Sequence, residues 1–144
     1  MTVPNRISII TFGVADLARS TAFYESLGWT RSNASMPTIT FFEMQGSVFG
    51  LYEWSALADD AKVPGEGSGF RGVTLAMNLA STDEVDAVFA EWVAAGATSQ
   101  VEPHTAFWGG YSSYVADPDG HLWEIAHNPY ARLDDDGHLV MGGS

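Results

Sequence analysis

Hydrophobic and polar residues follow one another along the chain in an order that occurs twice. In the first half, β-branched residues dominate residues 6–14 and predict a strand. A helix is predicted at about 17–27, because Asp16 is a favourable N-cap residue and Gly28 is placed to end the helix. Three short β segments are expected after this helix, at residues 29–32, 38–44 and 47–53.

The second half repeats this order. Residues 69–79 predict a strand, and a helix is predicted at about 82–95 because Ser81 and Glu84 have the spacing of a capping box. The apolar face of this helix consists of Val85, Val88, Phe89 and Trp92. Three β segments are again expected, at residues 97–102, 110–116 and 121–127, with a tight Asp-Pro-Asp-Gly turn between the last two.

The repeated order predicts an α+β fold of two paired βαβββ modules. We place module one at about 6–54 and module two at about 69–128. The polar residues 55–68 are predicted to be a linker, and residues 129–144 a polar tail on the surface. We expect one domain over residues 1–144, since this is the usual size of a single domain. An ordinary α+β domain without a repeat would give the same pattern of segments.

The composition excludes several classes of partner and chemistry. Six basic and eighteen acidic residues give a net charge of −12, which disfavours binding to nucleic acids and to anionic membranes. No apolar run approaches the roughly 20 residues of a membrane-spanning helix, and the N-terminus lacks the pattern of a secretory signal. The absence of cysteine excludes disulfides, thiolate metal sites and cysteine nucleophiles. We therefore expect a cytoplasmic protein with no nucleic-acid or membrane partner.

Two stretches carry a resemblance to a known family. Residues 13–29 (GVADLARSTAFYESLGW) and residues 108–129 (WGGYSSYVADPDGHLWEIAHNP) resemble the first helix and the closing hairpin of the vicinal-oxygen-chelate superfamily. This superfamily comprises glyoxalases, bleomycin resistance proteins and extradiol dioxygenases. The resemblance implies that the two modules form a cupped, half-open, eight-stranded mixed sheet around a pocket, and that a homodimer completes the pocket.

The resemblance also implies where a divalent metal would be held. Catalytic members place four ligands at positions that correspond to Ile9, Leu51, Thr74 and Glu124 of this chain. Only Glu124 is a competent ligand, whereas a catalytic zinc ion needs three protein ligands. Among the neighbouring residues, only Glu53 could supply a donor in module one. We therefore expect no metal cofactor.

Glu124 is the candidate catalytic residue. On the predicted strand, Leu122, Glu124 and Ala126 share one face, so the carboxylate would lie in the cup and could act as a general acid or base. The alternative is a structural carboxylate that is hydrogen-bonded to a neighbouring strand. Further candidates for ligand binding are Trp54, Arg71, His104, Phe107, Trp108 and Tyr111. For each of these side chains the alternative is core packing, surface ion pairing or a loop position.

Three functions are compatible with these observations. The first is binding of a small organic ligand by a protein of the glyoxalase/bleomycin-resistance type that lacks the divalent metal. The second is a lyase, isomerase or dioxygenase-like enzyme that uses Glu124 as a base or as a metal ligand. The third is an interaction domain without a small ligand. The missing metal ligands and the aromatic residues expected around the cup favour the first function.

Overall fold

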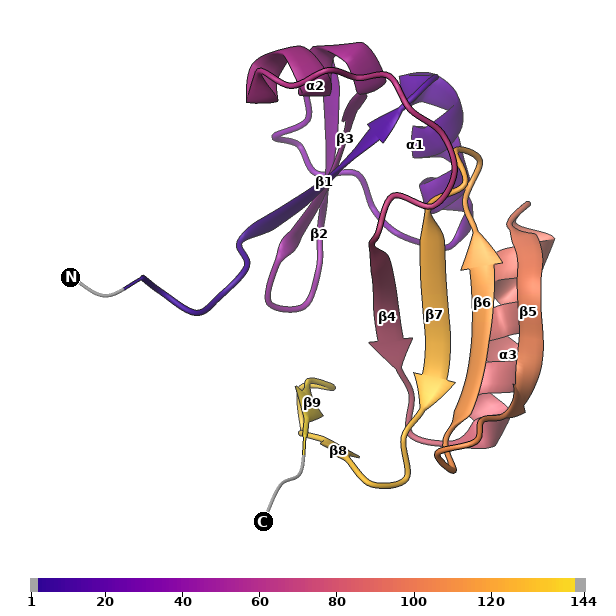
Figure 1. The fold of residues 1–144 in the computed structure, drawn as a ribbon. Coiled ribbons are helices and arrows are strands. Elements are labelled where there is room, and N and C mark those ends of the chain that lie inside the picture. The colour runs from indigo at the N-terminus through magenta and orange to yellow at the C-terminus, as the bar shows by residue number, and fades with distance from the viewer. Residues whose placement is uncertain (1–2, 142–144) are drawn as a thin grey trace. The chain divides into compact units, whose positions relative to one another are not determined.

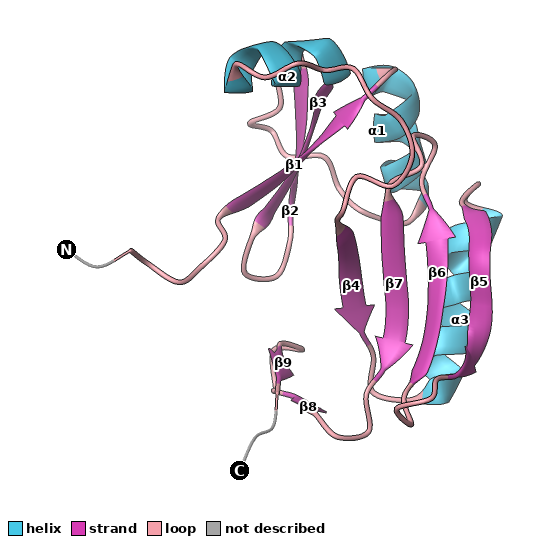
Figure 2. Cartoon of the chain, in the orientation of Figure 1, coloured by secondary structure: helices cyan, strands magenta, loops and turns pink. Residues whose placement is uncertain are grey.

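The computed structural model describes residues 3–141, which divide into two compact units after Gly67 (Figure 1). The units have similar element orders, as Figure 2 shows by secondary structure. Helices and sheets of mixed strand direction occur in both, which confirms the predicted α+β fold. No helix among the described residues is long and apolar enough to span a membrane.

The first unit contains one three-stranded sheet and two helices. Its elements are β1 (Ile9–Val14), α1 (Leu17–Ser26), β2 (Ile39–Glu43), β3 (Val48–Glu53) and α2 (Trp54–Ala61). The strand order is β1-β3-β2, in which β1 runs parallel and β2 antiparallel to the central strand. Helix α1 begins as predicted, because the side chain of Asp16 accepts a hydrogen bond from the backbone N–H of Arg19.

The core of the first unit is aromatic. Phe49 on β3 is 2% exposed, and its ring lies 5.0 Å from the ring of Phe12 and 4.9 Å from that of Tyr24. Trp29 stacks on Tyr24 with the ring planes 18° apart. A hydrogen bond between the hydroxyls of Thr21 and Thr40 joins α1 to β2 on the same side of the sheet. Helix α1 therefore covers the sheet face that presents Phe12, Thr40 and Phe49.

The strand expected at residues 29–32 does not form. Within the described residues it is reduced to one bridge between Arg31 and Phe42. The cause is a turn that begins at Ser32, whose hydroxyl accepts a hydrogen bond from Ala34 N–H while its carbonyl accepts one from Ser35 N–H. The two main sheets thus contain seven strands instead of the expected eight.

The prediction of a linker at residues 55–68 was wrong for the first half of this segment, where helix α2 forms. The carboxylate of Glu53 caps this helix by accepting hydrogen bonds from Ser55 N–H and Ala56 N–H. The helix ends at Lys62, which has a left-handed backbone conformation with φ of 60°. The segment is polar overall, but its apolar residues have the spacing typical of a helix, at Trp54, Leu57, Ala58 and Ala61.

The second unit has the complete βαβββ order, followed by a short hairpin. Its elements are β4 (Thr74–Asn78), α3 (Thr82–Ala94), β5 (Thr98–Thr105), β6 (Tyr111–Ala116), β7 (Leu122–His127), β8 (Arg132–Leu133) and β9 (Leu139–Val140). The main sheet has the strand order β4-β7-β6-β5, with β4 parallel to β7 and the other neighbours antiparallel. Figure 1 shows α3 along one face of this sheet.

Helix α3 starts and packs as the sequence predicts. The Ser81 hydroxyl accepts from Glu84 N–H, and the Glu84 carboxylate accepts from Ala80 N–H. Trp92 is 2% exposed and packs on Trp123 of β7, with the ring centroids 5.2 Å apart. Beyond the main sheet, residues 129–141 of the expected polar tail form the β8–β9 hairpin, while residues 142–144 lie outside the described part of the chain.

Candidate functional site

The main sheet of the second unit has one face packed by α3 and one face without a helix of that unit. Trp123 and Ile125 are buried on the α3 side, so Glu124 between them points to the opposite face. Tyr111 marks the α3 side, because its hydroxyl donates a hydrogen bond of 2.8 Å to Asp86 of that helix. We call the opposite face, which carries Glu124, the open face.

Glu124 lies at the centre of the open face. In the strand register it is opposite Ala76 of β4 on one side and Tyr114 of β6 on the other. The Ser112 hydroxyl donates a hydrogen bond of 2.7 Å to Oε2 of the half-buried carboxylate. One carboxylate oxygen is therefore held from a neighbouring strand, and the small side chain of Ala76 leaves space beside it.

Tyr114 supplies a phenol next to this carboxylate. Burial raises the pKa of the Tyr114 hydroxyl, and the negative charge of Glu124 raises it further. A tyrosine hydroxyl is protonated at neutral pH even without this shift, so the phenol can act as a hydrogen-bond donor. Glu124 and Tyr114 together offer a ligand one anionic acceptor and one neutral donor.

His104 also belongs to the open face. The sequence placed it in a loop, but β5 extends to Thr105 and His104 lies directly opposite Ser112. Side chains of directly opposite residues point to the same face of a sheet, so His104 and Ser112 share the face of Glu124. Nδ1 of His104 lies 3.1 Å from the carbonyl oxygen of Glu102 and must donate there, because a carbonyl can only accept.

Three other predicted ligand-binding residues are not brought to Glu124. Tyr111 lies on the α3 side, where its hydrogen bond to Asp86, with burial and that residue's charge, raises the pKa of its phenol. Phe107 and Trp108 occupy the turn between β5 and β6, which is closed by a hydrogen bond from Ala106 N–H to Gly110 O. Phe107 is fully exposed, and Trp108 covers the backbone of Gly110.

The remaining two candidates are Trp54 and Arg71. Trp54 belongs to the first unit, where its indole N–H donates to the carbonyl of Gly65 at 2.8 Å. A methyl group on Gly13 of β1 would lie 3.1 Å from the Trp54 ring, which shows how closely the ring packs there. Arg71 is exposed and precedes β4. Trp54 thus has a packing role within its own unit.

The residues at the metal positions implied by the resemblance do not fit a divalent metal. Leu51 is fully buried on the face packed by α1, and the opposite face carries its neighbour Gly50, next to Thr11 and Phe41. Ile9 has no donor atom, and Thr74 has only a neutral hydroxyl. Glu124 is the single strong donor of the set, whereas catalytic sites use three.

Two other sets of possible metal ligands do not supply the missing donors. The hydroxyl of Ser55, with the N–H groups of Ala56 and Ser55, holds the pKa of Glu53 below its usual value, so that carboxylate is occupied as a helix cap. Among residues 3–141, the one group of three metal-ligand side chains consists of Asp134, Asp136 and His138. This group lies in the exposed turn of the β8–β9 hairpin and does not include Glu124.

Comparison with known proteins places these observations in a family. The family model described as Glyoxalase/Bleomycin resistance protein/Dioxygenase superfamily matches residues 6–125. No curated protein matches the chain. A solved structure of a glyoxalase-related enzyme from Fulvimarina pelagi is 34% identical with a TM-score of 0.86, covering 97% of this chain and 100% of its own.

More distant structures share the fold. A glyoxalase/bleomycin resistance protein/dioxygenase from Nocardioides is 26% identical with a TM-score of 0.74, and the match covers 88% of this chain and 85% of that one. Lactoylglutathione lyase from Agrobacterium tumefaciens is 21% identical with a TM-score of 0.66, with 88% and 96% covered. The family match over residues 6–125 and the 34% identity over nearly the whole chain lead to one conclusion. The chain belongs to the glyoxalase/bleomycin resistance protein/dioxygenase superfamily.

Proposed function

We propose that this protein binds a small organic molecule on the open face around Glu124, without a divalent metal. The observation that carries the proposal is the isolated Glu124 carboxylate, held by Ser112 at 2.7 Å beside the Tyr114 phenol. Small-molecule sites combine a few oriented polar groups with apolar surface. Here the polar groups come from three adjacent strands, and the exposed Ala76 supplies a small apolar neighbour.

The anionic character of the site favours a ligand with a hydrogen-bond donor or a positive charge. Glu124 accepts one hydrogen bond from Ser112 and retains acceptor capacity on its other oxygen. The net charge of −12 raises the local concentration of cationic solutes around the protein. We therefore infer that the preferred ligand is neutral or cationic and donates a hydrogen bond to Glu124.

The Glu124→Gln variant tests both parts of this proposal. We expect purified wild-type protein to contain far less than one transition-metal ion per chain, and chelators to leave its melting temperature unchanged. Compounds that raise the melting temperature of the wild type should bind Glu124→Gln about tenfold more weakly, because a charge-assisted hydrogen bond is lost. Elemental analysis, thermal unfolding and fluorescence titration through the five tryptophans measure these effects.

Glu91→Gln is the matched control, since Glu91 is an exposed residue of α3 and the substitution makes the same change of charge. It should bind every compound as the wild type does. A metal-to-protein ratio near one that is lost in Glu124→Gln, together with several degrees of stability, would contradict the metal-independent site. Equal affinity of wild type and Glu124→Gln for all compounds would contradict binding at Glu124.

An enzyme of the lyase or isomerase kind is the second candidate. It is favoured by the description of the 34% identical Fulvimarina pelagi protein as a glyoxalase-related enzyme. In such an enzyme Glu124 would be the general base, with the Tyr114 phenol as a neighbouring donor. Turnover of a bound compound that falls at least about 100-fold in Glu124→Gln, with little change in affinity, would support this role over simple binding.

We further propose that the protein forms a homodimer. β1 and β4 are edge strands of their sheets. Ile9 on β1 is 51% exposed, and Val73 just before β4 is 62% exposed. Edge strands with exposed apolar side chains are sites of pairing with another chain. Light scattering at micromolar concentration should give twice the monomer mass of 15.5 kDa, and Ile9→Lys should shift the protein toward monomer. A monomer mass for the wild type would contradict the proposal.

A further inference from the structure

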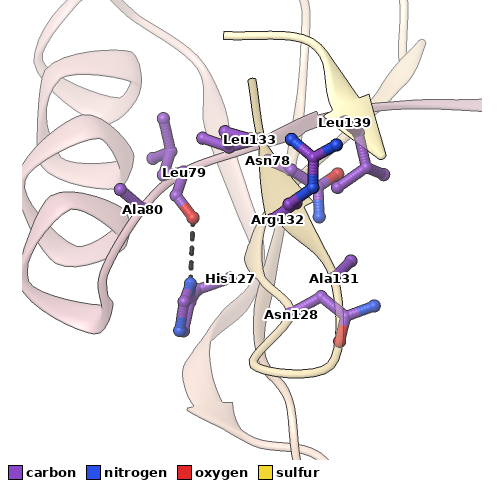
Figure 3. A pocket seen from close by; sticks show the side chains of 9 residues that line it. All are labelled: Asn78, Leu79, Ala80, His127, Asn128, Ala131, Arg132, Leu133 and Leu139. Atoms are coloured by element: carbon purple, nitrogen blue, oxygen red, sulfur yellow. Dashed lines mark hydrogen bonds between the residues drawn. The ribbon is translucent and has the colours of Figure 1, made fainter. Parts of the chain in front are cut away.

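A pocket lies in the second unit, between the ends of β4 and β7 and the β8–β9 hairpin (Figure 3). Its volume is about 170 Å³. Most of the residues that line it follow residue 125, where the match to the family model ends. The pocket is therefore largely a feature of this chain's C-terminal segment, and it shares no lining residue with the contacts described for Glu124.

Three of the side chains that line this pocket carry hydrogen-bond donors. Arg132 contributes a guanidinium group, and Asn78 and Asn128 contribute amides. Because the Oδ1 atom of Asn128 accepts a hydrogen bond from Tyr130 N–H, its NH₂ group remains for a ligand. His127 is fixed in the wall, since its Nδ1 donates to the carbonyl oxygen of Leu79 at 2.9 Å.

Arg132 is the strongest of these donors. Within residues 3–141 its guanidinium has no hydrogen bond or ion pair, although the charge of Asp134 acts on it from nearby. The Asp134 carboxylate is engaged elsewhere, because it accepts hydrogen bonds from His138 N–H and Asp136 N–H. These two bonds lower the pKa of Asp134, and so do the charges of His138 and Arg132. Arg132 thus retains its planar set of donors for a ligand.

The rest of the wall is aliphatic. Leu79, Leu133 and Leu139 line the pocket, and they come from the end of β4 and from both strands of the hairpin. A cavity of about 170 Å³ is smaller than the roughly 300–1,000 Å³ of sites for drug-sized ligands. The ligand must therefore be small, with an anionic head for Arg132 and a short apolar part for the leucines.

We propose that this pocket binds a short aliphatic monocarboxylate. The carboxylate would pair with the guanidinium of Arg132 and accept hydrogen bonds from the amides of Asn78 and Asn128. The net charge of −12 and the adjacent residues Asp134 to Asp136 disfavour a second negative charge, so a monocarboxylate is preferred over a dicarboxylate. This proposal is independent of the function proposed for the open face.

The test is a titration of ¹⁵N-labelled protein with sodium butyrate at constant ionic strength, followed by NMR. We expect saturable shifts of the side-chain NH₂ signals of Asn78 and Asn128, with a dissociation constant in the millimolar range. Arg132→Gln should weaken binding at least about tenfold, as expected for loss of a charge-assisted hydrogen bond. Arg6→Gln, which makes the same change of charge at an exposed position of the first unit, should bind butyrate as the wild type does.

Two further compounds test the charge preference of the pocket. Butyramide, which has no charge, and succinate, which has two, should each bind at least several-fold more weakly than butyrate. Asn78 lies in β4, outside the hairpin, so the variant Asn78→Ala tests the pocket even if Arg132→Gln loosens the hairpin. We expect Asn78→Ala to weaken butyrate binding several-fold. Equal binding by Arg132→Gln and Asn78→Ala, equal binding of butyramide, or shifts confined to the neighbours of Glu124 would overturn the proposal.

Discussion

Replacing Phe49 with alanine is expected to lower the free energy of unfolding by about 3–5 kcal/mol, the usual cost of removing a buried phenylalanine ring. The side chain is 2% exposed and lies within 5.0 Å, centroid to centroid, of the rings of Phe12 and Tyr24. The loss creates a cavity that these rings cannot fill without leaving their own contacts. Since whole domains are stable by only about 5–15 kcal/mol, the variant should be close to unfolding at 37 °C.

Chemical denaturation followed by circular dichroism measures this effect. Phe107→Ala is the matched control, because it removes the same ring from a fully exposed position and should change stability by no more than about 0.5 kcal/mol. Phe49→Leu keeps most of the buried volume and should fall between the two variants. If Phe49→Ala were no less stable than Phe107→Ala, the aromatic cluster would not be the core of the first unit.

The sequence predicted those parts of the fold that depend on local signals. Asp16 and the Ser81–Glu84 pair cap their helices as expected, since a cap needs only a side-chain oxygen within a few residues of the free N–H groups. Gly28 and Gly96 both have positive φ after their helices, at 92° and 111°. Strand positions were recovered to within a few residues for the same reason, apart from the expected strand at residues 29–32 and the start of β4, which was expected at residue 69 and lies at Thr74.

Prediction failed where two local structures compete for one segment. At residues 29–32 the pattern favoured a strand, but the Ser32 hydroxyl stabilises a turn that ends the pairing after one bridge. At residues 55–61 the polar composition favoured a linker, but capping by Glu53 starts a helix. In both cases the hydrogen bonds of one side chain favour the competing structure, and a pattern of hydrophobic positions does not contain such contacts.

The candidate site was likewise predicted from the sequence only in part. Alternation along β7 correctly predicted that Glu124 points away from Trp123 and Ile125. The partner Ser112 could have been found only from the pairing of β6 with β7, which the sequence does not state. His104 was harder still, because β5 has two register shifts before His104 comes opposite Ser112.

Replacing Asp117 with alanine is expected to lower the free energy of unfolding by about 2–4 kcal/mol, because two part-buried backbone N–H groups lose their acceptor. Asp117 begins the Asp-Pro-Asp-Gly turn between β6 and β7 and is 4% exposed. Its Oδ1 atom accepts hydrogen bonds of 2.9 Å from both Asp119 N–H and His121 N–H. Without these bonds the turn that sets the register of Glu124 against Tyr114 loses two of the hydrogen bonds that support it, while its backbone bond from Gly120 N–H to Asp117 O remains.

Two controls isolate the role of the acceptor oxygen. Asp117→Asn retains an oxygen in the same place and should cost only about 1 kcal/mol, the difference between a charged and a neutral acceptor. Asp135→Ala removes an exposed carboxylate and should stay within about 0.5 kcal/mol of the wild type. The denaturant midpoints of the three variants give the order of their stabilities. If Asp117→Asn lost as much stability as Asp117→Ala, the charge of Asp117 would hold the turn, and its two hydrogen bonds would not.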